Sequence, residues 1–297
     1  MGKDLHRVIL VSDMHYTTEE TPEQMRLIRP DVRTSVAAGD AFGYTQKEKV
    51  AFVLSDLLSQ GDDVDAVFVL GDLSIDDYSY RNLPDNYCRK FKEECMDKLP
   101  CPSYAIAGNH DSYPDAVWQE IFGYGRQFSV KLHDAVFIML DTFHHVPATG
   151  ASGSAYTDVD IAFLKQELEK YLTEKVFLCA HHFKTHENEE FARILRENDR
   201  IVCLFRGHTH INAVLRPESL SGKTLVDIGG YGYMGRNEDG KWIFNTFDPA
   251  WAWGYEVLEW DQTHVHMYHV KPKRRYLGGN GEFDYPGAIE DDICWEI

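Results

Sequence analysis

Short apolar runs alternate with amphipathic stretches along most of the chain. The apolar runs predict β-strands at 6–12, 65–70, 103–107, 126–132, 135–140, 175–180, 201–206, 211–216, 223–228, 254–260 and 264–269. Helical periodicity predicts α-helices at 46–60, 86–98, 114–122, 157–172 and 188–198. Strands that alternate with helices are typical of an α/β protein with parallel strand pairs.

Two of the predicted helices have recognisable ends. In 157–172, Leu164 and Leu168 share one apolar face, and Thr157 is the expected N-cap. The helix that begins near residue 46 is expected to stop at Gly61, since glycine readily adopts the left-handed conformation that follows a helix.

Two stretches depart from this alternation. Residues 16–45 show no clean periodicity, and long segments of this kind are often lids or binding loops. From about residue 240 the composition becomes aromatic. We therefore predict one main domain at 1–240, with 16–45 as an insertion or lid, and a C-terminal elaboration at 241–297 packed on the same domain.

Five of the apolar runs end in side chains that commonly bind metals. The residues are Asp13 and His15, Asp72, Asn109 with His110 and Asp111, His181 with His182, and His208 with His210. Ligands of α/β sheets bind outside the carboxyl ends of the strands. We therefore expect these strand ends to converge on one pocket.

The spacing and the donor types point to metal chemistry. Residues i and i+2 of an extended chain point the same way, so Asp13 with His15, and His208 with His210, are expected to act as bidentate pairs. Carboxylate, imidazole and amide donors without thiolate suit manganese, iron, zinc, cobalt or nickel. A calcium or magnesium cage made only of oxygen atoms would not use four histidines.

The ordered motifs D-x-H, G-D, G-N-H-D, a strand-end histidine and G-H-x-H span residues 13–210. Together they resemble the calcineurin-like metallophosphoesterase superfamily, and most nearly its cyclic-nucleotide and small-phosphodiester branches. The resemblance implies an α/β fold, a four-layer αββα sandwich of two facing mixed β-sheets with flanking helices.

The resemblance also implies a binuclear centre that holds two transition-metal ions, with manganese, iron or zinc expected. One ion would take Asp13, His15, Asp72 and His210, and the other Asp72, Asn109, His181 and His208, so that Asp72 bridges them. Of the adjacent histidines, His181 is the expected ligand and His182 the alternative. A metal-bridging hydroxide would attack phosphorus, with His110 stabilising the phosphoryl charge or protonating the leaving group.

Some positions depart from the pattern of the superfamily. The carboxylate that orients the catalytic histidine in many members is replaced here by Ile75, so Asp76 or Asp111 would take that role. The arginines that protein serine/threonine phosphatases carry after G-D and before G-N-H are absent. These differences favour a small phosphodiester as substrate. The alternatives are a phosphomonoesterase or nuclease of the same superfamily, or an inactive metal-binding interaction module.

Composition limits the choice of partners. A net charge of −18 and a pI near 5.1 argue against binding to nucleic acid or to anionic membrane surfaces. The six cysteines include no C-x-x-C pair, and no apolar run is long enough to span a bilayer. We therefore expect a cytoplasmic enzyme that acts on a small phosphoester, and the oligomeric state stays open.

Overall fold

The computed structural model of the chain describes residues 5–16, 46–74, 87–111, 113–143, 156–184, 188–231, 254–278 and 281–297. At 46–49, 274–278 and 281–285, it describes the backbone alone.

The first sheet has six strands in the order β14-β11-β10-β1-β2-β3. Their bounds are β1 (His6–Val11), β2 (Ala66–Leu70), β3 (Ser103–Ile106), β10 (Tyr255–Trp260), β11 (His264–Lys271) and β14 (Ala288–Glu296). Strands β1, β2 and β3 are parallel, whereas β10, β11 and β14 continue the sheet in antiparallel pairs. A separate hairpin joins β12 (Arg274–Gly278) to β13 (Gly281–Tyr285).

The second sheet also has six strands, in the order β4-β5-β6-β7-β9-β8. Their bounds are β4 (Phe128–Leu132), β5 (Ala135–Leu140), β6 (Lys175–Ala180), β7 (Ile201–Arg206), β8 (Asn212–Leu215) and β9 (Thr224–Ile228). The four inner strands are parallel, and the edge strands β4 and β8 are antiparallel to their neighbours. In both sheets, therefore, the parallel strands bring their carboxyl ends to one side.

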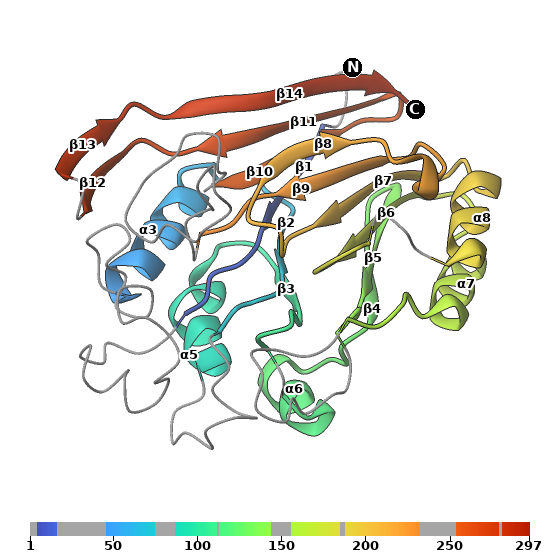
Figure 1. The fold of residues 1–297 in the computed structure, drawn as a ribbon, viewed down its shortest axis with the longest axis horizontal. Helices are drawn as coiled ribbons and strands as arrows, with labels where there is room; N and C mark the ends of the chain where they lie inside the picture. The colour runs from blue at the N-terminus through green and yellow to red at the C-terminus, as the bar shows by residue number, and fades with distance from the viewer. Residues whose placement is uncertain are drawn as a thin grey trace, which may run out of the picture.

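Helices cover the outer faces of the two sheets (Figure 1). They are α3 (Gln46–Leu58), α5 (Tyr87–Glu94) and α6 (Asp115–Phe122) on the first sheet, and α7 (Ile161–Lys170) and α8 (Glu189–Glu197) on the second. Short 3₁₀ turns occur at Met96–Lys98 and Glu218–Leu220. The structure thus confirms the αββα sandwich expected from the sequence.

The layer between the sheets is an apolar core. Phe68 of the first sheet stacks on Phe137 of the second with ring centroids 4.6 Å apart, and Phe137 stacks on Phe177 at 5.0 Å. Each of these rings is fully buried, which stabilises the fold by roughly 1.5–3 kcal/mol per side chain. This layer fixes one sheet against the other and hence the relative positions of their strand ends.

Several details differ from the sequence prediction. Helix α7 begins at Ile161 and its N-cap is Asp160, whose Oδ1 accepts a hydrogen bond from the Phe163 amide at 3.0 Å, so the prediction of Thr157 was wrong. Strands β12, β13 and β14 were not predicted. Apart from Tyr16, the expected insertion 16–45 lies outside the described residues, as does the expected domain boundary near residue 240.

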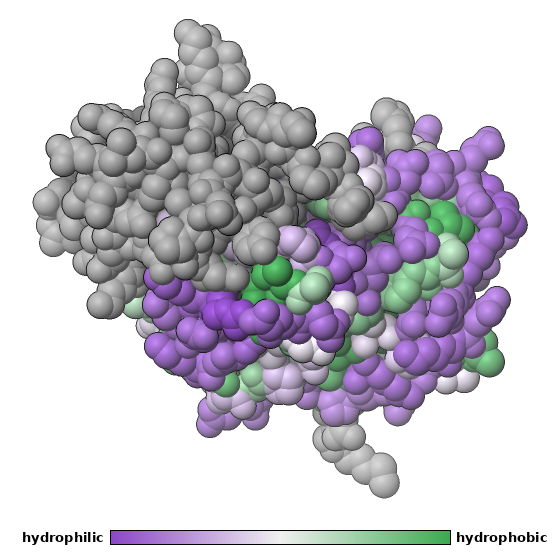
Figure 2. Space-filling view, turned by 90° about the horizontal axis from the view of Figure 1, so that it is seen from below, coloured by the Kyte–Doolittle hydropathy of each residue, from purple (hydrophilic) through white to green (hydrophobic). Residues whose placement is uncertain are grey.

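No helix among the described residues is long and apolar enough to cross a membrane. Seen from the side of α6, the described surface is mainly hydrophilic, with hydrophobic residues in patches between the polar ones (Figure 2).

Candidate metal centre

The chain leaves β1, β2 and β7 through left-handed turns. Positive φ angles occur at Asp13 (56°), His15 (44°), Asp72 (49°), His208 (67°) and His210 (53°). Such angles are uncommon outside glycine and cost about 1–3 kcal/mol each unless the surroundings hold them. The pairs at i and i+2 do reach the same site, but through these turns, so the predicted extended geometry was wrong.

Glycines let the backbone approach these side chains closely. A Cβ at Gly108 would lie 2.2 Å from Asp72 Oδ1 and 2.3 Å from the Asp72 amide nitrogen. A Cβ at Gly207 would lie 1.9 Å from Ser12 Oγ and 2.6 Å from Asp13 Oδ2. Both positions exclude any side chain, so G-N-H and G-H-x-H require their glycines for steric reasons.

The first group of donors consists of Asp13, His15 and His210. Asp13 Oδ1 lies 3.1 Å from His210 Nε2 and 3.7 Å from His15 Nε2, and the two imidazole nitrogens are 3.3 Å apart. Asp13 Oδ2 accepts a hydrogen bond from the His208 amide at 2.9 Å. Asp13 Oδ1 is buried and accepts no hydrogen bond from the described residues, so it is available to a cation.

The second group consists of Asp72, Asn109, His181 and His208. His181 Nδ1 donates to the Leu70 carbonyl at 2.7 Å in the tautomer that leaves Nε2 as a donor to metal. His181 Nε2 lies 3.3 Å from Asp72 Oδ2 and 3.2 Å from Asn109 Oδ1, and His208 Nδ1 lies 2.9 Å from the same amide oxygen. These donor atoms face a common point.

Asp72 lies between the two groups. Its Oδ2 is 3.7 Å from His15 Nε2 on one side and 3.3 Å from His181 Nε2 on the other. Its Oδ1 accepts a hydrogen bond from the His110 amide at 2.8 Å. This is the position that a bridging carboxylate would need.

The electrostatics of the site favour cations. Burial opposes ionisation of Asp13, but His210 and His181 outweigh it and lower the pKa of that carboxyl. Burial of Asp72 is likewise outweighed by His181 and His110, so its pKa is well below the usual value. Burial would lower the pKa of His181, but Asp72 and Asp13 raise it to about 9. Two buried carboxylates therefore stay ionised and attract positive charge.

His110 lies at the edge of the site and is partly exposed. Its ring packs edge-on against the ring of His15 with centroids 4.9 Å apart. One of its ring nitrogens lies within 4.8 Å of donor atoms of His15 and Asp72. His110 is thus near enough to both groups to contact a bound substrate.

Asp111 joins the turn after β2 to the turn after β3. Its buried carboxylate accepts hydrogen bonds from the amides of Leu73 (3.1 Å), Ser74 (3.0 Å) and Gly108 (2.9 Å). Burial and the nearby Asp72 raise its pKa. These contacts assign Asp111 a role in holding the loops, and whether it also orients His110 stays a prediction. The alternative orienting residue, Asp76, lies outside the described residues.

An aromatic wall that the sequence did not reveal lines one side of the second group. Phe143 lies 5.6 Å from the ring of His208, and His182 packs on the same histidine at 4.6 Å. Tyr156 contacts His182 at 5.4 Å, and Lys184 Nζ lies 4.0 Å from the Tyr156 ring. His182 is largely buried against His208. This burial lowers the pKa of His182 to about 2. Residues 141–143, which follow β5, and His182, which follows β6, were the signals in the sequence for this wall.

A buried ion pair supports the G-H-x-H turn. Arg206 holds Asp227 through Nε to Oδ1 at 2.5 Å and Nη2 to Oδ2 at 3.0 Å, and its Nη1 donates to the Phe183 carbonyl. Thr209 Oγ1 also donates to Asp227 Oδ1 at 2.9 Å. The pair links β7 and β9 to the turn after β6, which fixes three strand ends relative to one another.

Comparison with known proteins places this site in context. The family model for calcineurin-like phosphoesterases matches residues 6–212. No curated protein sequence matches the chain. A dimetal phosphatase from Danio rerio has a similar structure, with 12% identity, a TM-score of 0.53, and coverage of 95% of this chain and 98% of that one.

Two further solved structures are more distant. Vacuolar protein sorting 29 from Cryptosporidium parvum has 13% identity and a TM-score of 0.39, and covers 99% of both chains. GAP50, the anchor in the inner membrane complex of Plasmodium, has 12% identity, a TM-score of 0.45, and coverage of 97% of this chain and 90% of that chain. Neither likeness is close enough to support an argument about function. The match of the family model over most of the chain shows that this protein belongs to the calcineurin-like phosphoesterase family.

Proposed function

We propose that the protein is a binuclear metal-dependent hydrolase of phosphoesters. The observation that carries the proposal is the convergence of seven donor side chains, with Asp72 between the two groups. One ion would be held by Asp13, His15, Asp72 and His210, and the other by Asp72, Asn109, His181 and His208. The donor distances of 2.9–3.7 Å within each group are those of atoms that face one small cation.

The donor set supports transition metals, with manganese, iron or zinc expected. When bound, two such ions would lower the pKa of water and neutralise charge on the phosphoryl group. The ionised carboxylates of Asp13 and Asp72 would hold this positive charge in a buried site. The left-handed turns would keep the donors in place during the reaction. The close backbone approach that Gly108 and Gly207 allow would do the same.

We propose that His110 contacts the substrate. Its backbone amide donates a hydrogen bond to Asp72 Oδ1, and its ring lies beside His15 at the partly exposed edge of the site. From there the imidazole would donate a proton to the oxygen that leaves phosphorus or a hydrogen bond to the phosphoryl oxygens.

A small phosphodiester is the substrate class that we propose. The net charge of −18 repels extended polyanions, whereas a compact ester with one negative charge could enter a site that two bound ions would make locally positive. The two arginines that would grip a phosphomonoester dianion are missing from the G-D and G-N-H motifs. The partly exposed rings of Tyr156 and His182, with Phe143 buried beside them, would offer an aromatic surface to an organic group of the substrate.

A substrate panel under one metal condition tests the proposal. The panel contains bis-p-nitrophenyl phosphate, p-nitrophenyl phosphate, cyclic nucleotides, single-stranded DNA and a phosphopeptide. We expect the highest kcat/KM on the small diesters, loss of activity with a chelator and recovery on adding manganese. A preference for DNA or phosphopeptide would overturn the substrate class, and full activity in chelator would overturn the metal-dependent mechanism.

A further inference from the structure

A second cluster of metal-binding side chains lies at the opposite end of the strands. His6 begins β1, Asp65 directly precedes β2, and His133 lies in the turn between β4 and β5. Their donor atoms lie within 4.8 Å of one another. We call these three residues the amino-end cluster, and none of them belongs to the phosphoesterase motifs.

The two histidines converge on one carboxylate. His133 Nε2 lies 2.9 Å from Asp65 Oδ1, and His6 Nδ1 lies 4.0 Å from Asp65 Oδ2. The two imidazole rings stack at 3.6 Å with an interplanar angle of 11°. Stacked imidazole rings repel each other when both are positively charged imidazolium ions, whereas neutral imidazoles are good ligands for a divalent ion.

The cluster is held in place by contacts of its neighbours. Asp65 Oδ2 accepts a hydrogen bond from the Arg7 amide at 2.9 Å, and the Asp65 amide donates to the Arg7 carbonyl at 2.7 Å. His133 has a φ of 55°, in the left-handed region that five candidate ligands of the other site also occupy. The next residue, Asp134, is fixed by Lys175 Nζ at 2.6 Å and by Trp260 Nε1 at 3.0 Å.

We propose that His6, Asp65 and His133 form a third metal site, which takes a borderline divalent ion such as Zn²⁺. Tetrahedral zinc with bonds of about 2.0–2.2 Å places its ligand atoms about 3.4 Å apart, so each donor must move by less than about 1 Å. The stacked rings must tilt apart, and the His133 side chain is 44% exposed and therefore has room to do so. Water would complete the coordination on the exposed side.

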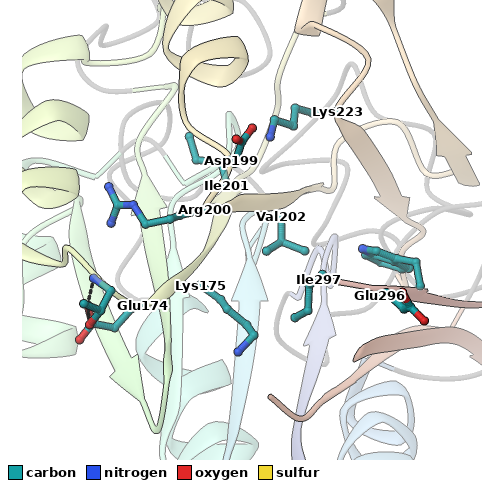
Figure 3. A pocket seen from close by; sticks show the side chains of 11 residues that line it. Glu174, Lys175, Asp199, Arg200, Ile201, Val202, Lys223, Glu296 and Ile297 are labelled. Carbon is teal, nitrogen blue, oxygen red and sulfur yellow. Dashed lines mark hydrogen bonds between the residues drawn. The ribbon is translucent and has the colours of Figure 1, made fainter. Parts of the chain in front are cut away.

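The position of the site indicates a structural role. His6 and Asp65 lie at the start of strands of the first sheet, whereas His133 lies in a turn of the second, so one ion would link the two sheets at the end remote from the candidate metal centre. A groove of about 430 Å³ lies on the same side, between the beginnings of β6 and β7 and the end of β14 (Figure 3). Lys175 lines this groove and pairs with Asp134 beside His133, so the bound ion would also stiffen the groove wall.

Zinc stoichiometry tests the site directly. We compare the wild-type protein with His133→Asn, because asparagine accepts the left-handed turn but removes the imidazole. His264→Asn is the matched control, since His264 is a comparably exposed histidine outside the cluster. After saturation with Zn²⁺ and removal of free metal, His133→Asn should carry one zinc fewer per chain than the other two proteins.

Asp65→Asn provides a second variant that keeps the shape of the side chain, and its zinc content should fall in the same way. Anomalous scattering at the zinc edge should place the ion about 2.0–2.2 Å from the three donor atoms. Equal zinc content in wild type, His133→Asn and Asp65→Asn would overturn the proposal and leave the cluster as a hydrogen-bonded contact. All these proteins keep the residues of the candidate metal centre, so the differences report on the amino-end cluster alone.

Discussion

The two ends of the sandwich use the same side-chain types in opposite surroundings. At the carboxyl ends, Asp13 and Asp72 are fully or almost fully buried and face several imidazoles. At the amino ends, Asp65 is 27% exposed and His133 is 44% exposed. Buried charge has to be balanced locally, whereas exposed charge is screened by water and salt. Under our proposals, the buried centre would depend on bound cations to balance its carboxylates, whereas the exposed cluster would hold a cation without depending on it.

The strongest test of this difference removes the central carboxylate. Asp72→Ala should abolish hydrolysis and reduce bound metal at the centre from two ions toward none, because that carboxylate serves both groups. Asp13→Ala should lose one ion. Elemental analysis and kcat on bis-p-nitrophenyl phosphate measure both effects. The assignment of the bridge is wrong if the Asp72 variant keeps two ions while the Asp13 variant loses both.

The next test separates metal binding from proton transfer. His110→Ala should fold and keep its metals but lose about 10²–10⁴ in kcat, the usual contribution of a proton-transfer residue. The loss should shrink for p-nitrophenolate esters, whose leaving group needs little protonation. His264→Ala, which changes an exposed histidine outside both clusters, is the control and should keep wild-type kcat. A loss that is equal for all leaving groups would indicate stabilisation of the phosphoryl charge instead.

A third test concerns the steric demand at the carboxyl ends. Gly108→Ala places a Cβ against backbone and carboxylate atoms of Asp72, so it should lower the free energy of unfolding by about 1–3 kcal/mol. It should also weaken metal affinity by about 10–100-fold, as changes that displace a ligand do. Gly125→Ala is the control, because its Cβ would meet nothing closer than 3.9 Å. Denaturant unfolding and metal titration measure the two effects. Equal stability and equal metal affinity of the two variants would show that the close approach at Gly108 is unimportant.

The smallest effect is expected at the amino ends. Although partial burial opposes ionisation, Lys175 and Trp260 hold the pKa of Asp134 below its usual value. The pair therefore stabilises the fold above the unfolded-state pKa of about 3.9, and this contribution is lost as the pH falls through the lower folded-state pKa. Asp134→Asn should cost less than about 1 kcal/mol at pH 7, because the Asp134 side chain is 41% exposed, and less still at pH 2. Unfolding curves at both pH values check this, with kcat unchanged.

The sequence predicted the frame of the molecule well because burial leaves a strong pattern. Strands such as β5 and β6 are apolar at almost every position, and their bounds were predicted to the residue. β14 escaped prediction because its sequence, AIEDDICWE, is mostly charged or exposed, as suits an edge strand. Asp160 was missed as an N-cap because several polar residues precede α7, and only the backbone decides which of them caps.

The site was predictable as a set of residues but not as a geometry. Each ligand follows an apolar strand, which the sequence shows, whereas left-handed angles at Asp13 and His208 depend on contacts across the sheets. The aromatic wall around His208 joins residues from the segments after β5 and β6 and the segment before α7, with no shared motif. The amino-end cluster was invisible for the same reason, since His6, Asp65 and His133 are far apart in the sequence.

Four candidate ligands follow strands of the first sheet and three follow strands of the second. The geometry of the candidate centre therefore depends on the relative position of the two sheets. With two manganese ions bound as proposed, their magnetic coupling would depend on the distance between ligands that belong to different sheets. Phe137 lies in the layer between those sheets, stacked on Phe68. Phe137→Leu should thus alter the paramagnetic resonance spectrum of the centre without touching any ligand. The spectrum of the bound metal pair would then report changes in the packing of the core between the two sheets.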